Sequence, residues 1–360
     1  MLRILQSKGK EHLITVVSPA DAIIGKYILD IETRPESCSP GRNFFYVLFN
    51  PWCKDDSTFL PGDAQKNEYV LNHIGTLYTL ANVPGSEWTY GQFEEGILDC
   101  CLYLLDKSKL VAKERRDPVK ITRAMSALVN KEDDEGVLEG KWKLKKSCDG
   151  HTCPHSWKGS VPILNEYYKT KKPVKYAQCW VFSGVLTTIL RCLGIPTRSV
   201  TTYDAGVDKD GNLKIEHPDD TVWNFHVWND VWMKRPDLPD GHDGWQAVDG
   251  TNQKPSLGIY RCGPASLKAI KKGEIDLDYD TRFLFAAVNA EYTVKIGTRI
   301  ITRSLCEGKP FENIMDDYKF PEGSIERTKA LELAKSLPIP KNDLAQTYGQ
   351  SHLEELNQTK

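Results

Sequence analysis

Three residues of types that support nucleophilic catalysis occur in the order Cys179, His226 and Asp249. A cysteine nucleophile needs a nearby base, and the base needs a group that orients it. His226 is the only one of the eight histidines inside a strand-like apolar segment, and Asp249 ends a later segment of that kind. A carboxylate there would accept the imidazole Nδ1–H and stabilise the imidazolium. The order and context therefore predict a Cys–His–Asp triad.

A helix predicted directly after Cys179 would position the nucleophile. Apolar residues repeat at helical spacing through residues 181–193, and the repeat stops at Gly194 and Pro196. The positive end of the helix dipole would stabilise a Cys179 thiolate, and the backbone N–H of Cys179 would face a developing oxyanion. Read singly, Cys179 also suits an inert core cysteine, His226 a satisfied core histidine and Asp249 a turn cap.

The hydrophobic pattern predicts an α+β chain. Strand-like segments span 12–17, 25–31 and 43–49, helical patterns span 65–71, 93–105 and 117–129, and strands return at 199–203, 223–228 and 245–249. A helical half followed by a strand half favours α+β over an alternating parallel sheet. Because three strands are too few for a β-sandwich, we expect the chain to be a fragment that starts inside a β domain.

Composition excludes several functional classes. The 360 residues carry a net charge of -2 and have no long basic block, which argues against nucleic acid as a partner. No apolar run reaches membrane-spanning length, and the first residues are too short for a signal peptide. The ten cysteines show no regular framework. They are therefore expected to be mostly reduced thiols in a cytoplasmic protein, although non-classical export would leave no mark of this kind.

Several long motifs resemble the animal transglutaminase family. They occupy residues 176–185 (YAQCWVFSGV), 191–198 (RCLGIPTR), 223–228 (WNFHVW), 244–251 (GWQAVDGT) and 262–264 (CGP). The resemblance covers nearly the whole chain. It implies a partial immunoglobulin-like β-sandwich over 1–49, a papain-like catalytic core over 50–337 and a polar linker over 338–360, without the family's C-terminal β-barrels.

The same resemblance implies a reaction and its partners. A protein glutamine would acylate Cys179 and release ammonia, and a protein lysine or small primary amine would then take the acyl group as an isopeptide. Cys179 would be the nucleophile, His226 the base and Asp249 its orienting partner. Trp157, in the segment SWKGS, would donate its indole N–H to the oxyanion, and Trp223 would wall the amine tunnel. Ala177 and Ser183 depart from the family pattern but are small, as the family requires.

Three oxygen-rich groups match calcium sites of the family. In the first, oxygen side chains alternate through residues 208–216 as in a calcium loop, but Leu213 at the sixth position argues against an EF-hand. The resemblance assigns as Ca²⁺ ligands Asp208, Asp210, Asn212 and Asp220 in the first group, Asn130 and Asp134 in the second, and Asn289, Glu291, Glu322 and Glu326 in the third. The segment holding Glu322 and Glu326 is one residue shorter than the family pattern. Without the resemblance, residues 208–216 would be read as a solvated turn.

Other interpretations remain open at this point. Cys148, His151, Cys153 and His155 are potential zinc ligands, but their spacing is unusual for a structural site, and an ordinary loop or a local disulfide also fits. A papain-like hydrolase or deamidase would use the same triad with water as acceptor. A catalytically silent structural homologue would keep the fold without turnover.

Overall fold

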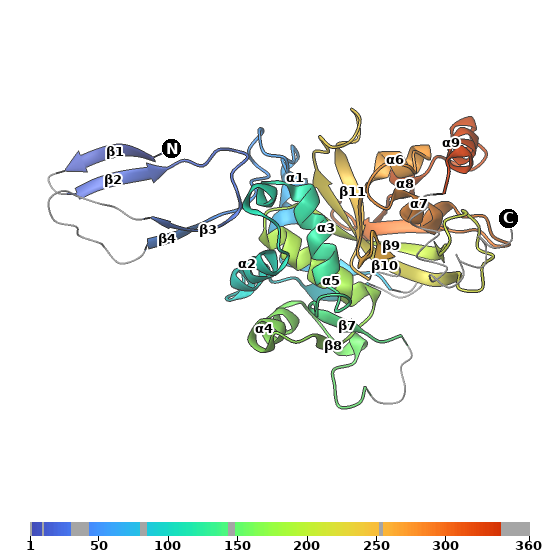
Figure 1. Ribbon diagram of the computed structural model, residues 1–360, viewed down its shortest axis with the longest axis horizontal. Helices are drawn as coiled ribbons and strands as arrows, with labels where there is room; N and C mark the ends of the chain where they lie inside the picture. The colour runs from blue at the N-terminus through green and yellow to red at the C-terminus, as the bar shows by residue number, and fades with distance from the viewer. Residues whose placement is uncertain are drawn as a thin grey trace, which may run out of the picture.

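A computed structural model describes residues 2–8, 11–29, 43–79, 85–142, 148–251 and 255–339. Its centre is a six-stranded antiparallel sheet in the order β14–β11–β10–β9–β15–β16 (Figure 1). The strands are β9 (Thr197–Val207), β10 (Thr221–Met233), β11 (Gly244–Asp249), β14 (Cys262–Ser266), β15 (Arg299–Arg303) and β16 (Phe311–Asn313). The three strands predicted in this half of the chain are confirmed as parts of β9, β10 and β11.

Both faces of the sheet are covered by helices. Ala247 packs into one hydrophobic core and the next residue, Val248, into the other, as alternation along a strand requires. One face carries α2 (Ile97–Lys107), α3 (Pro118–Leu128), α4 (Val161–Thr170) and α5 (Cys179–Cys192); the other carries α6 (Leu267–Lys272), α7 (Thr281–Asn289), α8 (Met315–Tyr318) and α9 (Ile325–Ser336). The α+β fold class is confirmed.

Helix α5 is the most deeply buried helix on its side of the sheet. It packs against β9 and β10, and almost all its residues are buried, which explains its apolar character on every side. The helix ends where Gly194 adopts a φ of 87°, and a Cβ there would lie 2.2 Å from the Phe49 carbonyl oxygen. Glycine is therefore required for the chain to leave α5 beside Phe49. This end of α5 is fixed, so its N-terminus holds Cys179 in a defined place.

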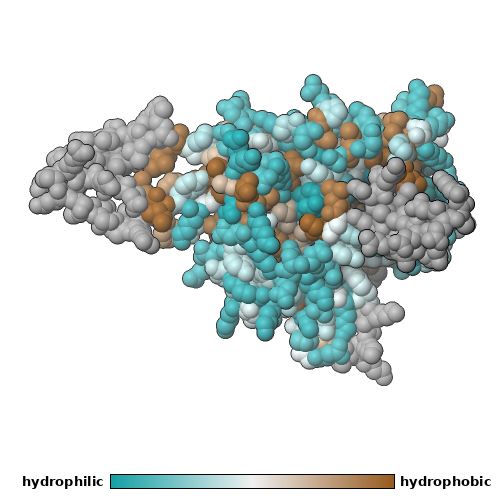
Figure 2. All heavy atoms as spheres, viewed as in Figure 1, coloured by the Kyte–Doolittle hydropathy of each residue, from teal (hydrophilic) through white to brown (hydrophobic). Residues whose placement is uncertain are grey.

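The N-terminal strands form two separate antiparallel pairs that extend from the body of the molecule (Figure 1). They are β1 (Leu2–Lys8) with β2 (Glu11–Val16), and β3 (Gly25–Leu29) with β4 (Asn43–Val47). Strand β1 was not expected from the sequence. Hydrophobic residues gather over the β3–β4 pair in Figure 2, where Ile28 and Phe44 are each 55% exposed. Whether these strands belong to a β-sandwich stays a prediction.

The remaining elements are short and lie between those of the sheet and its covering helices. They are α1 (Asp63–Lys66), a π-helix at Asn67–Leu71, β5 (Ile74–Leu77) with β6 (Ser86–Thr89), 3₁₀ turns at Ala112–Arg116 and Pro154–Ser156, β7 (Leu138–Gly140) with β8 (Val174–Ala177), and β12 (Pro255–Ser256) with β13 (Ile259–Tyr260). The helices expected near 65–71, 93–105 and 117–129 are confirmed, though the first is split and the second starts only after Gly96. Within the described ranges, no helix has the length and apolarity to cross a membrane. Residues 340–360, nearly all of the expected linker, lie outside the described residues.

Candidate active site

Cys179 is the first residue of α5. Gln178 precedes it in an extended conformation, and its side-chain amide donates to the Lys141 carbonyl at 2.9 Å. The first N–H groups of a helix have no acceptor within that helix, so the Cys179 amide is available to stabilise negative charge. The residue is only 3% exposed. A buried sulfur at a helix N-terminus matches the position predicted for a nucleophile.

His226 on β10 and Asp249 at the end of β11 form a buried pair. The His226 Nε2 and Asp249 Oδ2 atoms lie 2.6 Å apart, and the Thr251 N–H donates to Asp249 Oδ1 at 2.8 Å. The predicted partners therefore meet, but through Nε2 rather than the Nδ1 expected from the sequence. Strand register brings Asp249 to this end of the sheet, and it places no constraint on which ring nitrogen faces the carboxylate.

The charges of the pair stabilise one another. Burial favours a lower pKa for His226, but the Asp249 carboxylate, with added interaction from Cys179, raises it to about 10. Burial works in the opposite direction on Asp249, and there the His226 charge and hydrogen bonds from His226 and Thr251 prevail, lowering its pKa. The imidazolium form is thus favoured beside the Cys179 sulfur.

Tryptophan side chains surround the imidazole. The Trp223 ring meets the His226 ring edge-on at a centroid distance of 4.7 Å, and Trp142 lies against Trp223 at 5.3 Å. Trp223 was expected near the amine path, whereas Trp142 was not singled out from the sequence. No local pattern marks Trp142, because its partner stands 81 residues later in the chain. Together the two rings form an aromatic wall beside the candidate base.

Trp157 has a different partner from the one predicted. Its indole N–H donates to the Tyr176 carbonyl at 3.0 Å, just before the residues that lead into α5. An indole has a single N–H, so it would have to release this carbonyl before donating to an oxyanion. The predicted oxyanion role of Trp157 therefore stays a prediction.

Comparisons with known proteins identify similar sequences and structures. The family profile described as the Transglutaminase-like superfamily matches residues 145–250, a range that includes Cys179, His226 and Asp249. Protein-glutamine gamma-glutamyltransferase 4 of Homo sapiens is 43% identical over 91% of this chain and 52% of its own length. The human coagulation factor XIII A chain is 40% identical over 92% of this chain and 50% of its own length. The crystal structure of red sea bream transglutaminase matches with a TM-score of 0.83 at 38% identity, covering 92% of this chain and 56% of that one.

Residues 145–250 therefore form a transglutaminase-like domain, and about nine-tenths of the chain is similar to transglutaminases. Its α+β core is accordingly of the papain-like kind, as the sequence predicted. The chain spans about half the length of the curated relatives that it matches.

The first oxygen-rich group of this chain fits a cation. Ligand oxygens of Asp208, Asp210 and Asp220 lie within 4.8 Å of one another. Burial is the main reason that the pKa of Asp208 rises to about 7, and neighbouring Asp210 adds to the rise. Asn212 instead uses its amide to donate to Asp210 at 3.1 Å. Backbone N–H groups of the loop already donate to all three carboxylates. Three facing carboxylates are nevertheless the oxygen ligands that a hard divalent ion prefers.

The second group is only partly arranged for a metal. Burial raises the pKa of Asp134 to about 6, and its Oδ1 atom has no hydrogen-bond partner among the described residues. Asn130, in contrast, donates its amide to the Thr251 carbonyl at 2.9 Å and accepts from the Glu132 N–H at 3.2 Å. Asp134 therefore fits a cation ligand, while Asn130 is committed to the loop that carries Asp249.

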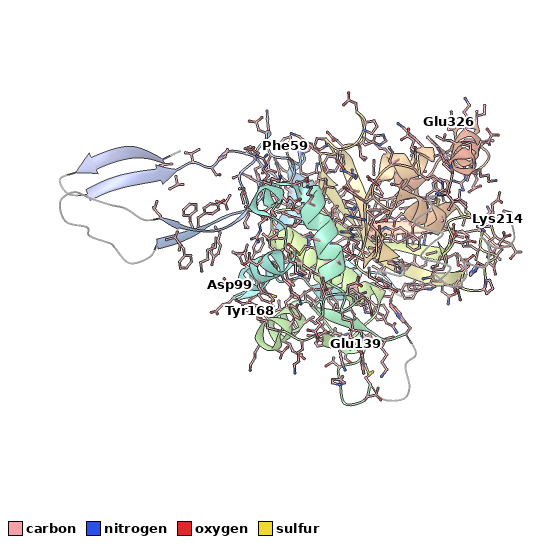
Figure 3. All side chains as sticks on the ribbon, in the orientation of Figure 1. Phe59, Asp99, Glu139, Tyr168, Lys214 and Glu326 are labelled. Carbon is pink, nitrogen blue, oxygen red and sulfur yellow. A yellow bond between two sulfur atoms is a disulfide. The ribbon has the colours of Figure 1, made fainter. Side chains whose placement is uncertain are left out.

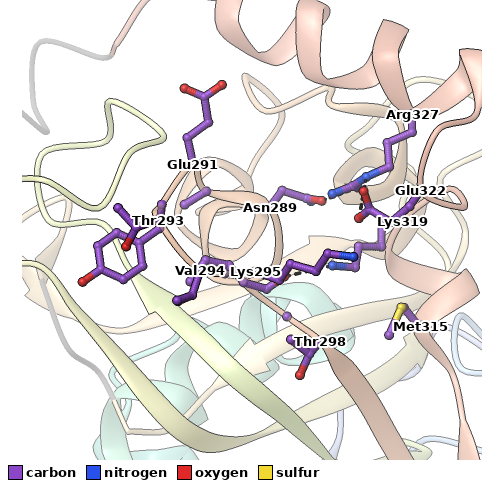
Figure 4. Close-up of a pocket in the computed structure, with 14 residues that line it drawn as sticks. Asn289, Glu291, Thr293, Val294, Lys295, Thr298, Met315, Lys319, Glu322 and Arg327 are labelled. Carbon is purple, nitrogen blue, oxygen red and sulfur yellow. Dashed lines mark hydrogen bonds and ion pairs between the residues drawn. The ribbon is translucent and has the colours of Figure 1, made fainter.

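The third group does not fit a divalent cation. Asn289 Oδ1 accepts from Arg327 Nη1 at 2.7 Å, and Arg327 Nε lies 3.1 Å from Glu322 Oε1 (Figure 4). Glu291 is ion-paired with Lys335. Glu326 lies exposed on α9, at the surface of the molecule (Figure 3). The residues expected as ligands thus either pair with basic side chains or face solvent.

Cys148 and Cys153 form a disulfide. Of the three interpretations of this segment, the local disulfide is therefore correct, and neither cysteine is available as a zinc thiolate. The expectation of reduced thiols fails at this pair. Seven other cysteines among the described residues are free, including Cys179.

Proposed function

We propose that this chain catalyses calcium-dependent transfer of a protein glutamine's γ-glutamyl group to a primary amine through a thioester on Cys179. The observation that carries the proposal is the buried cysteine at the start of α5, which interacts with His226 of the His226–Asp249 pair. In that pair, the His226 Nε2 and Asp249 Oδ2 atoms are 2.6 Å apart. Similarity to a protein-glutamine gamma-glutamyltransferase and to a transglutaminase structure supports the choice of an amide carbonyl as the group attacked.

In the first half-reaction, the Cys179 sulfur attacks the carboxamide carbon of glutamine. The C=O bond becomes an oxyanion, which the Cys179 N–H at the helix start would stabilise. When the oxyanion collapses, the C–N bond breaks and the His226 imidazolium gives its proton to the leaving nitrogen, so that ammonia departs. Asp249 holds the ring in place and stabilises its charged form.

In the second half-reaction, a neutral lysine amine attacks the thioester. His226 accepts a proton from the attacking nitrogen, the C–S bond breaks, and Cys179 leaves as the thiolate. The product is an isopeptide between the two side chains. Trp142 and Trp223 would exclude water beside His226, which favours the amine over hydrolysis.

Trp157 is the proposed second oxyanion donor. It would exchange its Tyr176 carbonyl partner for the oxyanion when substrate is bound. Since the Tyr176 carbonyl lies in the segment leading to Cys179, this exchange would couple substrate binding to the position of the nucleophile.

Calcium would be held by Asp208, Asp210 and Asp220, and by Asp134 in the second group. A bound Ca²⁺ ion would supply positive charge that offsets repulsion among these carboxylates. The Asp208 loop is tied to the body of the protein, because the Ile215 N–H donates to the Glu291 carbonyl at 2.9 Å and the Glu291 N–H donates to Leu213 at 2.8 Å. Fixing the loop would therefore also fix the end of α7.

The proposed boundaries remain 50–337 for the catalytic core, after a β region over 1–49 and before a linker over 338–360. Proposed substrates are glutamine-bearing proteins with lysine-bearing proteins or small primary amines. A cytoplasmic location is proposed on the sequence alone.

Incorporation of a fluorescent primary amine into a glutamine-rich protein tests the reaction. The chain should label the protein in the presence of Ca²⁺, and Cys179→Ala should abolish labelling; Cys306→Ala, which removes an exposed free thiol, is the matched control. Full labelling by Cys179→Ala would rule out the proposed nucleophile.

Two other functions predict different results in that assay. A deamidase or protease would release ammonia or cleave peptides at a rate independent of added amine. A silent homologue would give no turnover, and its Cys179 would not react selectively with an active-site thiol probe.

A further inference from the structure

Helices α7 and α9 meet at a small set of polar side chains. Asn289 is the last residue of α7, Glu322 stands shortly before α9, and Arg327 lies in the first turn of α9. Figure 4 shows Arg327 and Glu322 directed toward Asn289, with the Glu291 side chain pointing away from these three residues. The cavity beside them has a volume of about 540 Å³.

The Arg327 side chain fills this junction and contacts both Asn289 and Glu322. Its Nη1 atom is 2.7 Å from Asn289 Oδ1 and its Nε atom is 3.1 Å from Glu322 Oε1, so one guanidinium bridges both acceptors. The Arg327 side chain is 13% exposed. A planar guanidinium that is mostly buried and held by two acceptors is well ordered, unlike a lysine side chain exposed to solvent.

The position of Arg327 in its helix runs against helix electrostatics. Ser324 is the N-cap of α9 and accepts from the Arg327 N–H at 3.2 Å, so Arg327 is the third helical residue. Helix starts favour acidic side chains, and after a serine cap the third position favours Glu, whose side chain reaches back to the cap. The Arg327 cation does not gain the stabilisation that an acidic side chain would have at this position of the helix. Its contacts with Asn289 and Glu322 compensate for that loss.

Further positive charge lines the same cavity. Lys295 and Lys319 face it together with Arg327. The Lys319 amine donates to the Val288 and Ile296 carbonyls at 3.0 and 3.1 Å. Burial, reinforced by Arg327 and Lys295, lowers the pKa of Lys319 to about 8, as expected where like charges crowd. Glu291, which also lines the cavity, forms an ion pair with Lys335. A divalent cation would therefore enter a region that already carries an excess of positive charge.

We propose that Arg327 is a built-in cation at the junction of α7 and α9, standing where a divalent metal ion would otherwise join Asn289 to Glu322. The junction is then permanent and independent of the calcium concentration. Calcium acts on this chain through its other acidic groups. This inference concerns ion binding, and it holds whether or not the proposed transfer reaction takes place.

The test is the number of Ca²⁺ ions bound per chain, measured by isothermal titration calorimetry on the chelator-treated 360-residue chain with calcium chloride. The variants are Glu322→Gln, Arg327→Glu and Lys329→Glu. Lys329→Glu makes the same change of charge on the exposed side of α9 and is the matched control. Circular dichroism and the Tm in chelator are recorded for each variant.

We expect wild type, Glu322→Gln and Lys329→Glu to bind equal numbers of ions, and Arg327→Glu to bind one more. In chelator, Arg327→Glu should lower Tm by about 2–6 °C, because the bridging hydrogen bonds are lost and the new carboxylate lies beside Glu322. Calcium should then raise the Tm of Arg327→Glu further than that of wild type.

Two results would overturn the proposal. One is loss of an ion in Glu322→Gln, which would mean that metal displaces Arg327 in the native chain. The other is a folded Arg327→Glu variant with the wild-type ion count. If Arg327→Glu does not fold, the number of Ca²⁺ ions bound by wild type and by Glu322→Gln decides the test.

Discussion

Two buried ion pairs stand on the central sheet, and they are built for different purposes. His226 pairs with Asp249 at one place, and Arg198 of β9 pairs with Asp230 of β10 at another, with side-chain exposures of 4% and 2% in the first pair and 6% and 0% in the second. Burial alone therefore does not separate a catalytic pair from a structural one. Their remaining contacts do.

The Arg198–Asp230 pair is closed by groups that hold it in place. The two residues are direct cross-strand neighbours, joined by an Arg198 Nε to Asp230 Oδ2 hydrogen bond of 2.9 Å. Asp317 adds a second carboxylate at 3.0 Å, Tyr318 donates to Asp230, and the guanidinium stacks over Trp245 at 4.3 Å. Every component is engaged with protein.

The His226–Asp249 pair instead contains a titratable base that interacts with a thiol. Cys179 contributes to the raised pKa of His226. The uncharged Trp223 ring meets the imidazole edge-on. A perturbed base next to a nucleophile is the combination that marks functional sites. We therefore propose that the same sheet uses one ion pair for stability and the other for proton transfer, and the following predictions separate the two.

The largest expected effect is that of Asp249→Asn on catalysis. The amide would no longer stabilise the imidazolium, and turnover should fall about ten-thousandfold, as when the corresponding carboxylate of a serine-protease triad is replaced. Amine incorporation per folded chain is the measurement, with the folded fraction taken from circular dichroism. A fall below tenfold would show that Asp249 has no orienting role.

The next effect is that of Asp230→Asn on stability. The substitution leaves the buried Arg198 charge without its main partner, and the free energy of unfolding should fall by about 3–5 kcal/mol. Urea unfolding measures the loss. Turnover per folded molecule should stay within about twofold of wild type, since the hydrogen bonds and ion pairs of Arg198 and Asp230 within the described part of the chain go to residues other than Cys179, His226 and Asp249. A thousandfold loss of turnover would make the two pairs equivalent and the distinction wrong.

Removing the neutral hydrogen-bond donor of the Trp157 indole should have a smaller effect on turnover. Trp157→Phe keeps the ring and removes the N–H, and turnover should fall about a hundredfold if the indole exchanges the Tyr176 carbonyl for the oxyanion. KM for the amine should change little. A fall of less than tenfold would leave Trp157 as a support for the Tyr176 carbonyl. Trp142→Phe would then test the indole that packs against Trp223 as the donor.

Much of the fold and the triad could be predicted because their signals are local. The apolar repeat after Cys179 predicts α5, and β-branched and aromatic residues around His226 predict a strand. Strand β1 and the start of α2 after Gly96 were not predicted correctly. Gly96 has a φ of 80°, a conformation that the apolar pattern alone does not reveal.

The errors at the sites have a common cause in long-range packing. The ring nitrogen facing Asp249, the Trp142–Trp223 contact and the Tyr176 partner of Trp157 depend on how distant segments meet. Glu291 and Glu322 resemble metal ligands in sequence because the pattern does not show which basic side chains approach them. Arg327 did carry a signal, since it follows a serine cap at a position that favours Glu.

The pH dependence of stability gives the smallest effect and the most direct separation of the two pairs. Because the folded-state pKa of His226 is about 10 and the unfolded value 6.5, its contribution to stability is complete below pH 6.5 and is lost as the pH rises through 10. Each pH unit in this window corresponds to about 1.4 kcal/mol at most. The guanidinium of Arg198 keeps its proton throughout. Urea unfolding should therefore show the stability difference between wild type and Asp249→Asn shrinking by about 1 kcal/mol from pH 7 to pH 8. The difference between wild type and Asp230→Asn should stay constant. Equal changes in both differences would mean that His226 does not hold an extra proton in the folded state.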